Sequence, residues 1–141
     1  MVKYKFFDHT ADVLFEAYGK TLNELFENSA LALEETQTNL KDIKEKTKKT
    51  ITLKNESVEM LLFDFLQELI FLKDSRKLLF SKFKVKVKKD KENYILNSEA
   101  FGEKINPKKH ELKVDVKAVT LHQFKVEKKK DKWVARIILD I

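Results

Sequence analysis

Two acidic segments, one near each end of the chain, carry the residue types best suited to bind a metal ion. Asp8, His9 and Asp12 lie close together in a polar corner, and Asp140 is followed by the α-carboxylate of Ile141. If the strand that begins at residue 13 pairs with the last strand, Asp12 approaches Asp140 and the chain terminus. Three carboxylates at one point repel one another unless a cation lies between them. Oxygen ligands without sulfur favour a hard cation such as Ca²⁺ or Mg²⁺.

A second interpretation of the same residues needs no metal. Asp12 can be a turn residue whose side chain binds nearby backbone groups, as aspartates at chain corners often do. Asp140 can pair with one of the many lysines. Composition and spacing alone leave both interpretations open.

The sequence excludes several common catalytic sites. With Cys 0 and Gly 2, the chain has no thiolate ligand and no glycine-rich phosphate loop. His9, His110 and His122 lie in different segments, so no histidine pair has the spacing of a zinc site. Ser57 and Ser81 lie at a predicted helix start and in a predicted strand, which does not indicate a Ser-His-Asp arrangement. We therefore expect no catalytic activity of the chain on its own.

Length and composition predict one soluble, cytoplasmic domain. The 141 residues fit a single domain with one substantial core. The longest apolar stretch, residues 58–72, contains acidic residues and is too short and too polar to cross a bilayer. The first residues lack the apolar run of a signal peptide and lead directly into an alternating strand pattern.

The charge of the chain allows two explanations. Lys+Arg total 29 against 23 Asp+Glu, and Arg76 and Arg136 are the only arginines. The lysines can form a solvated surface, or a face that accepts RNA or an acidic partner. One predicted strand carries a lysine at every second position from 82 to 88, which suits either explanation. The sequence shows no aromatic stacking platform of the kind expected for single-stranded RNA.

The first half of the chain predicts two strands, a helix, a strand and a second helix. The strands cover residues 4–7 and 13–19, and Thr21 with Glu24 forms a capping box for a helix that ends near residue 35 or 36. A polar connection over residues 39–49 precedes a strand at 50–53. Ser57 can cap a helix to about residue 73, whose broad apolar arc predicts a deeper position against a sheet.

The second half predicts strands only. We expect strands at residues 80–88 and 94–101, one long or two short strands over 112–126, and a central strand at 133–141. The order is ββαβα followed by antiparallel strands. The predicted fold is a single α+β domain with two helices packed on one face of a mostly antiparallel, twisted sheet.

Both ends of the chain carry a characteristic motif. The opening YKFFDHTADV at residues 4–13 and the ending IILDI at 137–141 resemble the signature of the archease family. Between them, GKTL at 19–22, Gly102-Glu103, Lys109-His110 and VKAVT at 116–120 fit the same pattern in the same order. Leu121-His122-Gln123 departs from the more usual Tyr-His-Gly of the family.

The resemblance implies a function and a set of site residues. Archeases are non-enzymatic activators of the RtcB-type tRNA-splicing ligase, which joins RNA ends in tRNA splicing and RNA repair using GTP. They promote guanylylation of the ligase and its multiple turnover, and they bind a divalent metal ion, typically Ca²⁺. Carried over to this chain, the metal ligands would be Asp12, Asp140 and the terminal carboxylate of Ile141. Lys109 and His9 are further candidates for ligase activation.

Two other functions stay open at the level of the sequence. The chain could be a chaperone-like modulator that prevents aggregation of tRNA-modifying enzymes, or an RNA-binding module that uses its lysine surface. An activator should work at well below the stoichiometry of the ligase and require both aspartates. A chaperone should work stoichiometrically without them, and RNA binding should weaken steeply with salt.

Overall fold

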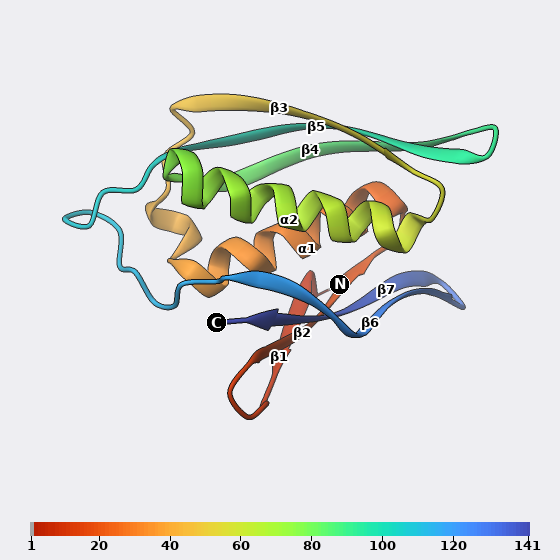
Figure 1. The fold of residues 1–141 in the computed structure, drawn as a ribbon, viewed down its shortest axis with the longest axis horizontal. Coiled ribbons are helices and arrows are strands. Elements are labelled where there is room, and N and C mark those ends of the chain that lie inside the picture. Colours follow the sequence, from red (N-terminus) through yellow and green to blue (C-terminus); the bar gives the residue numbers. More distant parts are fainter. Residues whose placement is uncertain (1) are drawn as a thin grey trace.

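The computed structural model describes residues 2–141 and contains seven strands, two α-helices and one short 3₁₀ helix (Figure 1). In chain order, the elements are β1 (Tyr4–Phe7), β2 (Val13–Gly19), α1 (Leu22–Gln37), η1 (Leu40–Asp42), β3 (Thr47–Asn55), α2 (Val58–Arg76), β4 (Leu78–Asp90), β5 (Asn93–Lys104), β6 (Ala118–Lys129) and β7 (Lys132–Asp140). This order confirms the predicted ββαβα arrangement followed by strands. No helix within residues 2–141 combines the length and the apolar character needed to cross a membrane.

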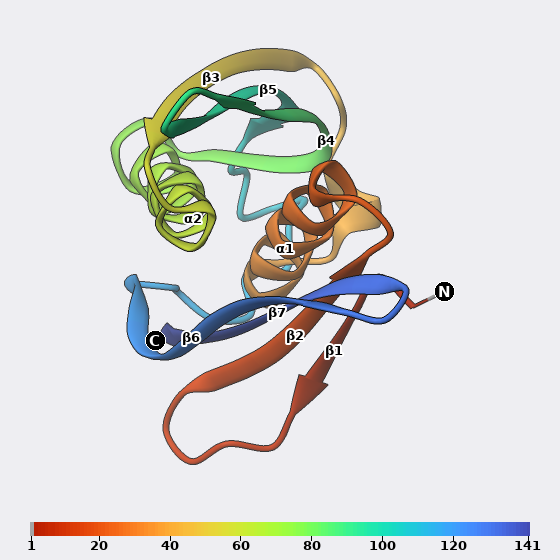
Figure 2. The same ribbon diagram turned by 90° about the vertical axis from the view of Figure 1, so that its right-hand side faces the viewer.

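The strands form two antiparallel sheets, with the helices between them (Figures 1 and 2). One sheet has the strand order β1-β2-β7-β6, and the other has the order β3-β5-β4. The predicted α+β class is confirmed, but we expected one sheet where the structure has two. The reason lies in α2, which is apolar over a broad arc and contacts both β6 of the first sheet and β3 of the second.

Side chains next to each helix fix where the helix begins. Thr21 accepts a hydrogen bond from the backbone N–H of Glu24 at the start of α1 (3.2 Å), and Ser57 does the same for Met60 at the start of α2 (3.3 Å). Each bond satisfies a backbone donor that the helix itself leaves free. At its other end, α2 continues past the predicted stop to Arg76, and Lys77 closes it in the left-handed conformation with φ of 57°.

The main core fills the space between the two sheets. Phe65 of α2 lies at its centre, stacked on Phe26 of α1 (centroids 6.2 Å apart) and edge-on to Phe83 of β4 (6.1 Å). All three rings are buried. The core therefore ties both helices to the β3-β5-β4 sheet.

The last strand lies in the middle of its sheet, as the sequence predicted. β7 pairs with β2 on one side and with β6 on the other. Its ladder with β2 runs from Trp133 opposite Gly19 to Leu139 opposite Val13. This register decides which residues meet at the end of the sheet.

Candidate metal centre

The start of β2 and the end of β7 meet at one edge of the four-stranded sheet. Val13 is paired with Leu139, so Asp12 and Asp140 occupy adjacent backbone positions just beyond that pair. Asp140 also faces Ala118 of β6, and its carbonyl oxygen accepts a hydrogen bond from Lys117 N–H (2.8 Å). The backbone at this end of β7 is therefore held on both sides. The C-terminus lies on the side of the molecule from which the β1–β2 loop projects (Figures 1 and 2).

The backbone immediately before Asp12 adopts an uncommon conformation. Ala11 has φ of 69°, in the left-handed region that residues with a Cβ seldom occupy. Such local strain is concentrated at functional sites in proteins. It turns the chain from the β1–β2 loop into β2 directly at the acidic edge.

The acidic edge, defined here as Asp12, Asp140 and the carboxylate of Ile141, carries uncompensated negative charge. His9 Nδ1 lies 3.9 Å from Asp12 Oδ2, and both side chains are about one-third exposed (29% and 35%). Within residues 2–141, no lysine or arginine forms an ion pair with Asp12 or Asp140. The interpretation in which a lysine neutralises Asp140 therefore finds no support among the described contacts.

The chemistry of these donors fits a hard divalent cation. Oxygen ligands from carboxylates are those that Ca²⁺ and Mg²⁺ prefer, and a cation would relieve the repulsion between neighbouring carboxylates. No group of three or more His, Cys, Asp or Glu side chains in residues 2–141 forms a cation site. A site at this edge would therefore need the main-chain carboxylate in addition to the two aspartates.

Lys109 lies in a different cluster, centred on the buried carboxylate of Glu103. Glu103 Oε2 accepts hydrogen bonds from Lys109 Nζ (2.6 Å) and from the backbone N–H of Lys44 (2.7 Å). His110 Nε2 lies 3.0 Å from the same oxygen, and Lys46 Nζ lies 3.6 Å from Oε1. Lys109 and His110 were noted from the sequence, but their contact with Glu103 was not predicted. This contact depends on a loop that folds back onto β5.

Hydrogen bonds fix the ionisation of Glu103 and the tautomer of His110. Burial favours the neutral acid, but the bonds from Lys109, from Lys44 N–H and from His110 outweigh it and lower the pKa of Glu103 to about 2. The backbone N–H of Asn106 donates to His110 Nδ1 (2.9 Å). The ring proton is therefore assigned to Nε2, from which it is donated to Glu103. This cluster anchors the loop that carries Lys109.

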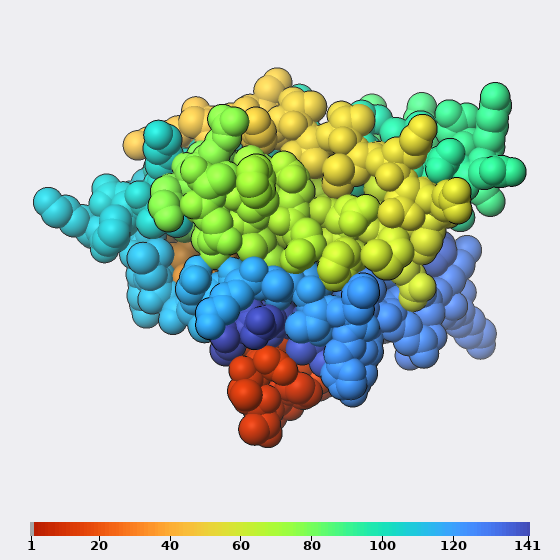
Figure 3. Space-filling view, viewed as in Figure 1, coloured from red at the N-terminus to blue at the C-terminus, as the bar shows by residue number. Residues whose placement is uncertain are grey.

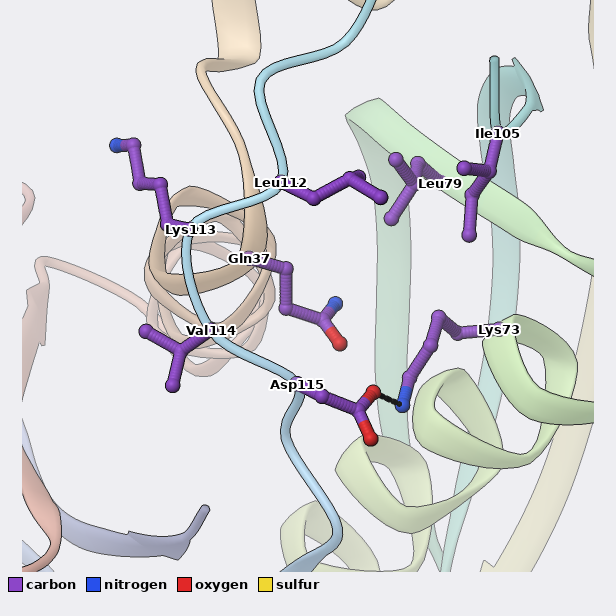
Figure 4. Close-up of a pocket in the computed structure, with 8 residues that line it drawn as sticks. All are labelled: Gln37, Lys73, Leu79, Ile105, Leu112, Lys113, Val114 and Asp115. Atoms are coloured by element: carbon purple, nitrogen blue, oxygen red, sulfur yellow. Dashed lines mark hydrogen bonds and ion pairs between the residues drawn. The ribbon is translucent and has the colours of Figure 1, made fainter. Parts of the chain in front are cut away.

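A small cavity of about 130 Å³ lies under the irregular segment at residues 111–117 (Figure 4). Leu79, Ile105 and Leu112 contribute apolar walls, and Gln37 points its amide group inward (Figure 4). Lys73 closes one side by donating hydrogen bonds to Asp115 Oδ1 (2.6 Å) and to the carbonyl oxygen of Val116 (2.8 Å). The cavity therefore lies between residues 111–117 and the C-terminal ends of α1 and α2, and it does not include the acidic edge.

Comparison with known proteins identifies full-length relatives. Residues 4–141 match the model of the Archease protein family (MTH1598/TM1083). The chain is 42% identical to "Protein archease" of Pyrococcus furiosus and 40% identical to that of Thermococcus kodakarensis, over 100% of each chain. The solution structure of Methanobacterium thermoautotrophicum protein 1598 is similar, with a TM-score of 0.88, 40% identity and 99% of both chains covered.

Proposed function

Because the chain belongs to the archease family, we propose that it is a non-enzymatic activator of an RtcB-type RNA-splicing ligase. The proposed role is to promote guanylylation of the ligase by GTP and to sustain repeated turnover in tRNA splicing and RNA repair. The support is the full-length match to the family, together with an edge where acidic residues from both ends of the chain adjoin.

The proposed metal ligands are Asp12, Asp140 and the terminal carboxylate of Ile141, with Ca²⁺ as the expected ion. A bound divalent cation would supply a positive charge able to attract phosphate oxygens. The residues of the chain hold the ion in position. The paired ends of β2 and β7 hold the two aspartates on a rigid sheet, which keeps the cost of organising the ligands low.

The shape of this end of the molecule suits entry into a concave partner. The β1–β2 loop projects from the body of the protein, at the lower edge in Figure 3. It carries His9 beside Asp12, so both lie where a docked ligase would meet them. The proposed action is to present charged groups to the nucleotide-transfer site of the ligase, or to hold that site in its competent form.

Guanylylation of the cognate ligase tests this proposal. The ligase is mixed with GTP and with the protein at one-tenth of the ligase concentration. Guanylate bound covalently to the ligase is then measured over time. Asp12→Asn and Asp140→Asn should each reduce the stimulated rate about tenfold or more, because each removes a ligand charge. Asp90→Asn and Asp131→Asn remove the same charge from exposed hairpin ends and should leave the stimulation unchanged. Full stimulation by both acidic-edge variants would refute the proposal.

Lys109 and His9 are proposed as further contacts with the ligase. His9→Gln and Lys109→Met should lower stimulation when the protein is limiting and recover it at higher concentration, as expected for weakened docking. If stimulation is lost at every concentration of the variant protein, the two residues would instead act in the guanylyl-transfer step itself.

The chaperone-like alternative predicts a different dependence on concentration. A protein that prevents aggregation acts at one copy per client and keeps its effect after loss of the aspartates. Light scattering of a tRNA-modifying enzyme, with and without the Asp12→Asn variant, distinguishes the two functions.

A further inference from the structure

The outer face of the β3-β5-β4 sheet is covered with lysines. The helices lie against its inner face, and no element within residues 2–141 covers the outer one (Figures 1 and 2). Four cross-strand rows, from Lys48–Phe101–Lys82 to Lys54–Ile95–Lys88, present their side chains outward. We call this surface the basic face; its six exposed lysines are Lys48, Lys54, Lys82, Lys84, Lys86 and Lys88.

The positive charge of the basic face is largely uncompensated. In these four rows the one carboxylate is Glu99, which pairs with Lys48 at 3.2 Å. The excess of positive charge on this face is therefore nearly as large as the formal net charge of +6 of the whole chain. The charges of the remainder of the surface nearly cancel in total, so the basic face carries most of the net charge of the chain.

The sheet arranges these charges at a regular spacing. Alternate residues of an extended strand are about 7 Å apart, so β4 presents a row of four lysine side chains on this face. A repeating line of point charges suits a chain of phosphates. Lysine, unlike arginine, lacks the rigid fork that reads base edges, which indicates binding without sequence preference.

An aromatic ring lies within the basic face. Phe101 is partly exposed in the central strand β5, with Lys82 Nζ and Lys84 Nζ at 5.7 and 5.6 Å from its ring centroid. A stacking platform was not expected from the sequence, because Phe101 meets these lysines only through the register of β4 and β5. A ring among cations is the combination by which proteins hold single-stranded nucleic acid.

We propose that the basic face binds the backbone of single-stranded RNA, with one base stacked on Phe101. An acidic protein is a less suitable partner, because protein interfaces are depleted in lysine and need a central apolar patch. The basic face offers only Phe101 and Ile95 in that role. The proposal goes beyond ligase activation, since it assigns a second ligand to a second surface.

The basic face and the acidic edge are on opposite sides of the helix layer. In Figure 1, the β3-β5-β4 sheet lies above the helices, whereas the C-terminus and the β1–β2 loop lie below them. RNA on one side therefore leaves the other side free for the ligase. The two activities are separable by mutation.

Fluorescence anisotropy with a labelled, mixed-sequence single-stranded RNA of 20 nucleotides tests the proposal. The quadruple variant Lys82→Gln/Lys84→Gln/Lys86→Gln/Lys88→Gln should bind about tenfold or more weakly at 0.1 M salt. The slope of log affinity against log salt should fall in magnitude by about 3, as expected for four lost phosphate contacts. Phe101→Leu should weaken binding about fivefold or more without changing that slope.

A charge-matched variant provides the control. Lys128→Gln/Lys129→Gln/Lys130→Gln/Lys132→Gln removes the same charge from the β6–β7 hairpin and should retain the affinity and the slope of the parent. Equal losses in both quadruple variants would mean non-specific attraction and would overturn the proposal, as would equally tight binding of poly-glutamate.

RNA-free guanylylation separates this inference from the proposed function. The basic-face variant should stimulate the ligase normally when no RNA is present. If it binds RNA normally but fails to stimulate, the RNA proposal is wrong and the basic face belongs to the ligase interface. If no variant of either surface affects stimulation, the proposed function fails while the anisotropy result still decides RNA binding.

Discussion

Val13 and Leu139 form the last antiparallel pair of the β2–β7 ladder, and the acidic edge depends on that pairing. A shift of one residue would turn Asp140 to the opposite face of the sheet. The register is secured by the buried side chains of Phe15 and Ile137, which face each other two residues further along. Packing in the core thus fixes the relative position of two groups at the surface.

Extension of the C-terminus should weaken binding of Ca²⁺. Two added residues, Gly-Ser, convert the carboxylate of Ile141 into an amide and remove one of the proposed charged ligands. Isothermal titration calorimetry should show about a tenfold or larger increase in Kd. The same dipeptide added at the N-terminus is the control, and unchanged affinity in the C-terminal extension would remove Ile141 from the ligand set.

Glu103 should make the protein sensitive to acid. Its pKa is lowered from 4.5 to about 2, so the folded state holds the carboxylate ionised where the unfolded state takes up a proton. The resulting contribution to the free energy of unfolding is complete above pH 4.5 and is lost as the pH falls toward 2. Glu103→Gln should lower the free energy of unfolding by about 2 kcal/mol at pH 7 and change it little near pH 2.

Denaturant unfolding between pH 2 and pH 7 measures this difference. Glu99→Gln, which removes an exposed carboxylate from the same strand, serves as the control and should track the parent. The same difference in free energy of unfolding between the Glu103→Gln variant and the parent at every pH would contradict a lowered pKa of Glu103.

Glu34 should have the opposite effect on stability. It is completely buried in α1, and burial raises its pKa to about 8 against the weaker lowering influence of the Phe80 N–H and of Lys73. Between pH 4.5 and 8 the folded state holds a proton that the unfolded state has lost, so the free energy of unfolding falls as the pH rises. Glu34→Gln mimics the neutral acid and should flatten this dependence.

Urea unfolding at pH 5 and pH 9 provides the measurement. The free energy of unfolding of the Glu34→Gln variant minus that of the parent should be larger at pH 9 than at pH 5. Glu45→Gln, at an exposed position before β3, should show no such crossover. A parent protein whose stability is flat over this range would rule out the buried proton.

Phe65 should be among the most costly residues to truncate. It is fully buried between Phe26 and Phe83, so Phe65→Ala leaves a cavity and should lower the free energy of unfolding by about 3–5 kcal/mol. Phe71 in the same helix is 57% exposed, and Phe71→Ala should change it by only about 0.5 kcal/mol. Chemical denaturation of the two variants side by side tests the placement of α2, and similar losses would contradict it.

Local features of the fold could be predicted from the sequence because their causes are local. The cap residues Thr21 and Ser57 mark the helix starts, and alternation from Phe83 to Val87 marks a strand. The position of Asp12 beside Asp140 also followed, once pairing of the second and last strands was assumed.

Features that depend on tertiary contacts could not be predicted in this way. The sequence predicted strand from residue 112 onward, but residues 111–117 are irregular up to the start of β6 at Ala118. Lys73 explains the difference, because its side chain binds Asp115 and the carbonyl oxygen of Val116 in place of a strand partner. The division of the strands into two sheets, and the joining of Glu103 to Lys109, likewise arise from contacts between distant segments.

The layer of helices that separates the two sheets has a consequence for assembly. Ligands on opposite outer surfaces do not compete for space, so their binding free energies should add without any rearrangement of the protein. With the proposed RNA and ligase partners, a ternary complex would form by simple mass action, and the protein would raise the local concentration of a nucleic acid strand around the enzyme.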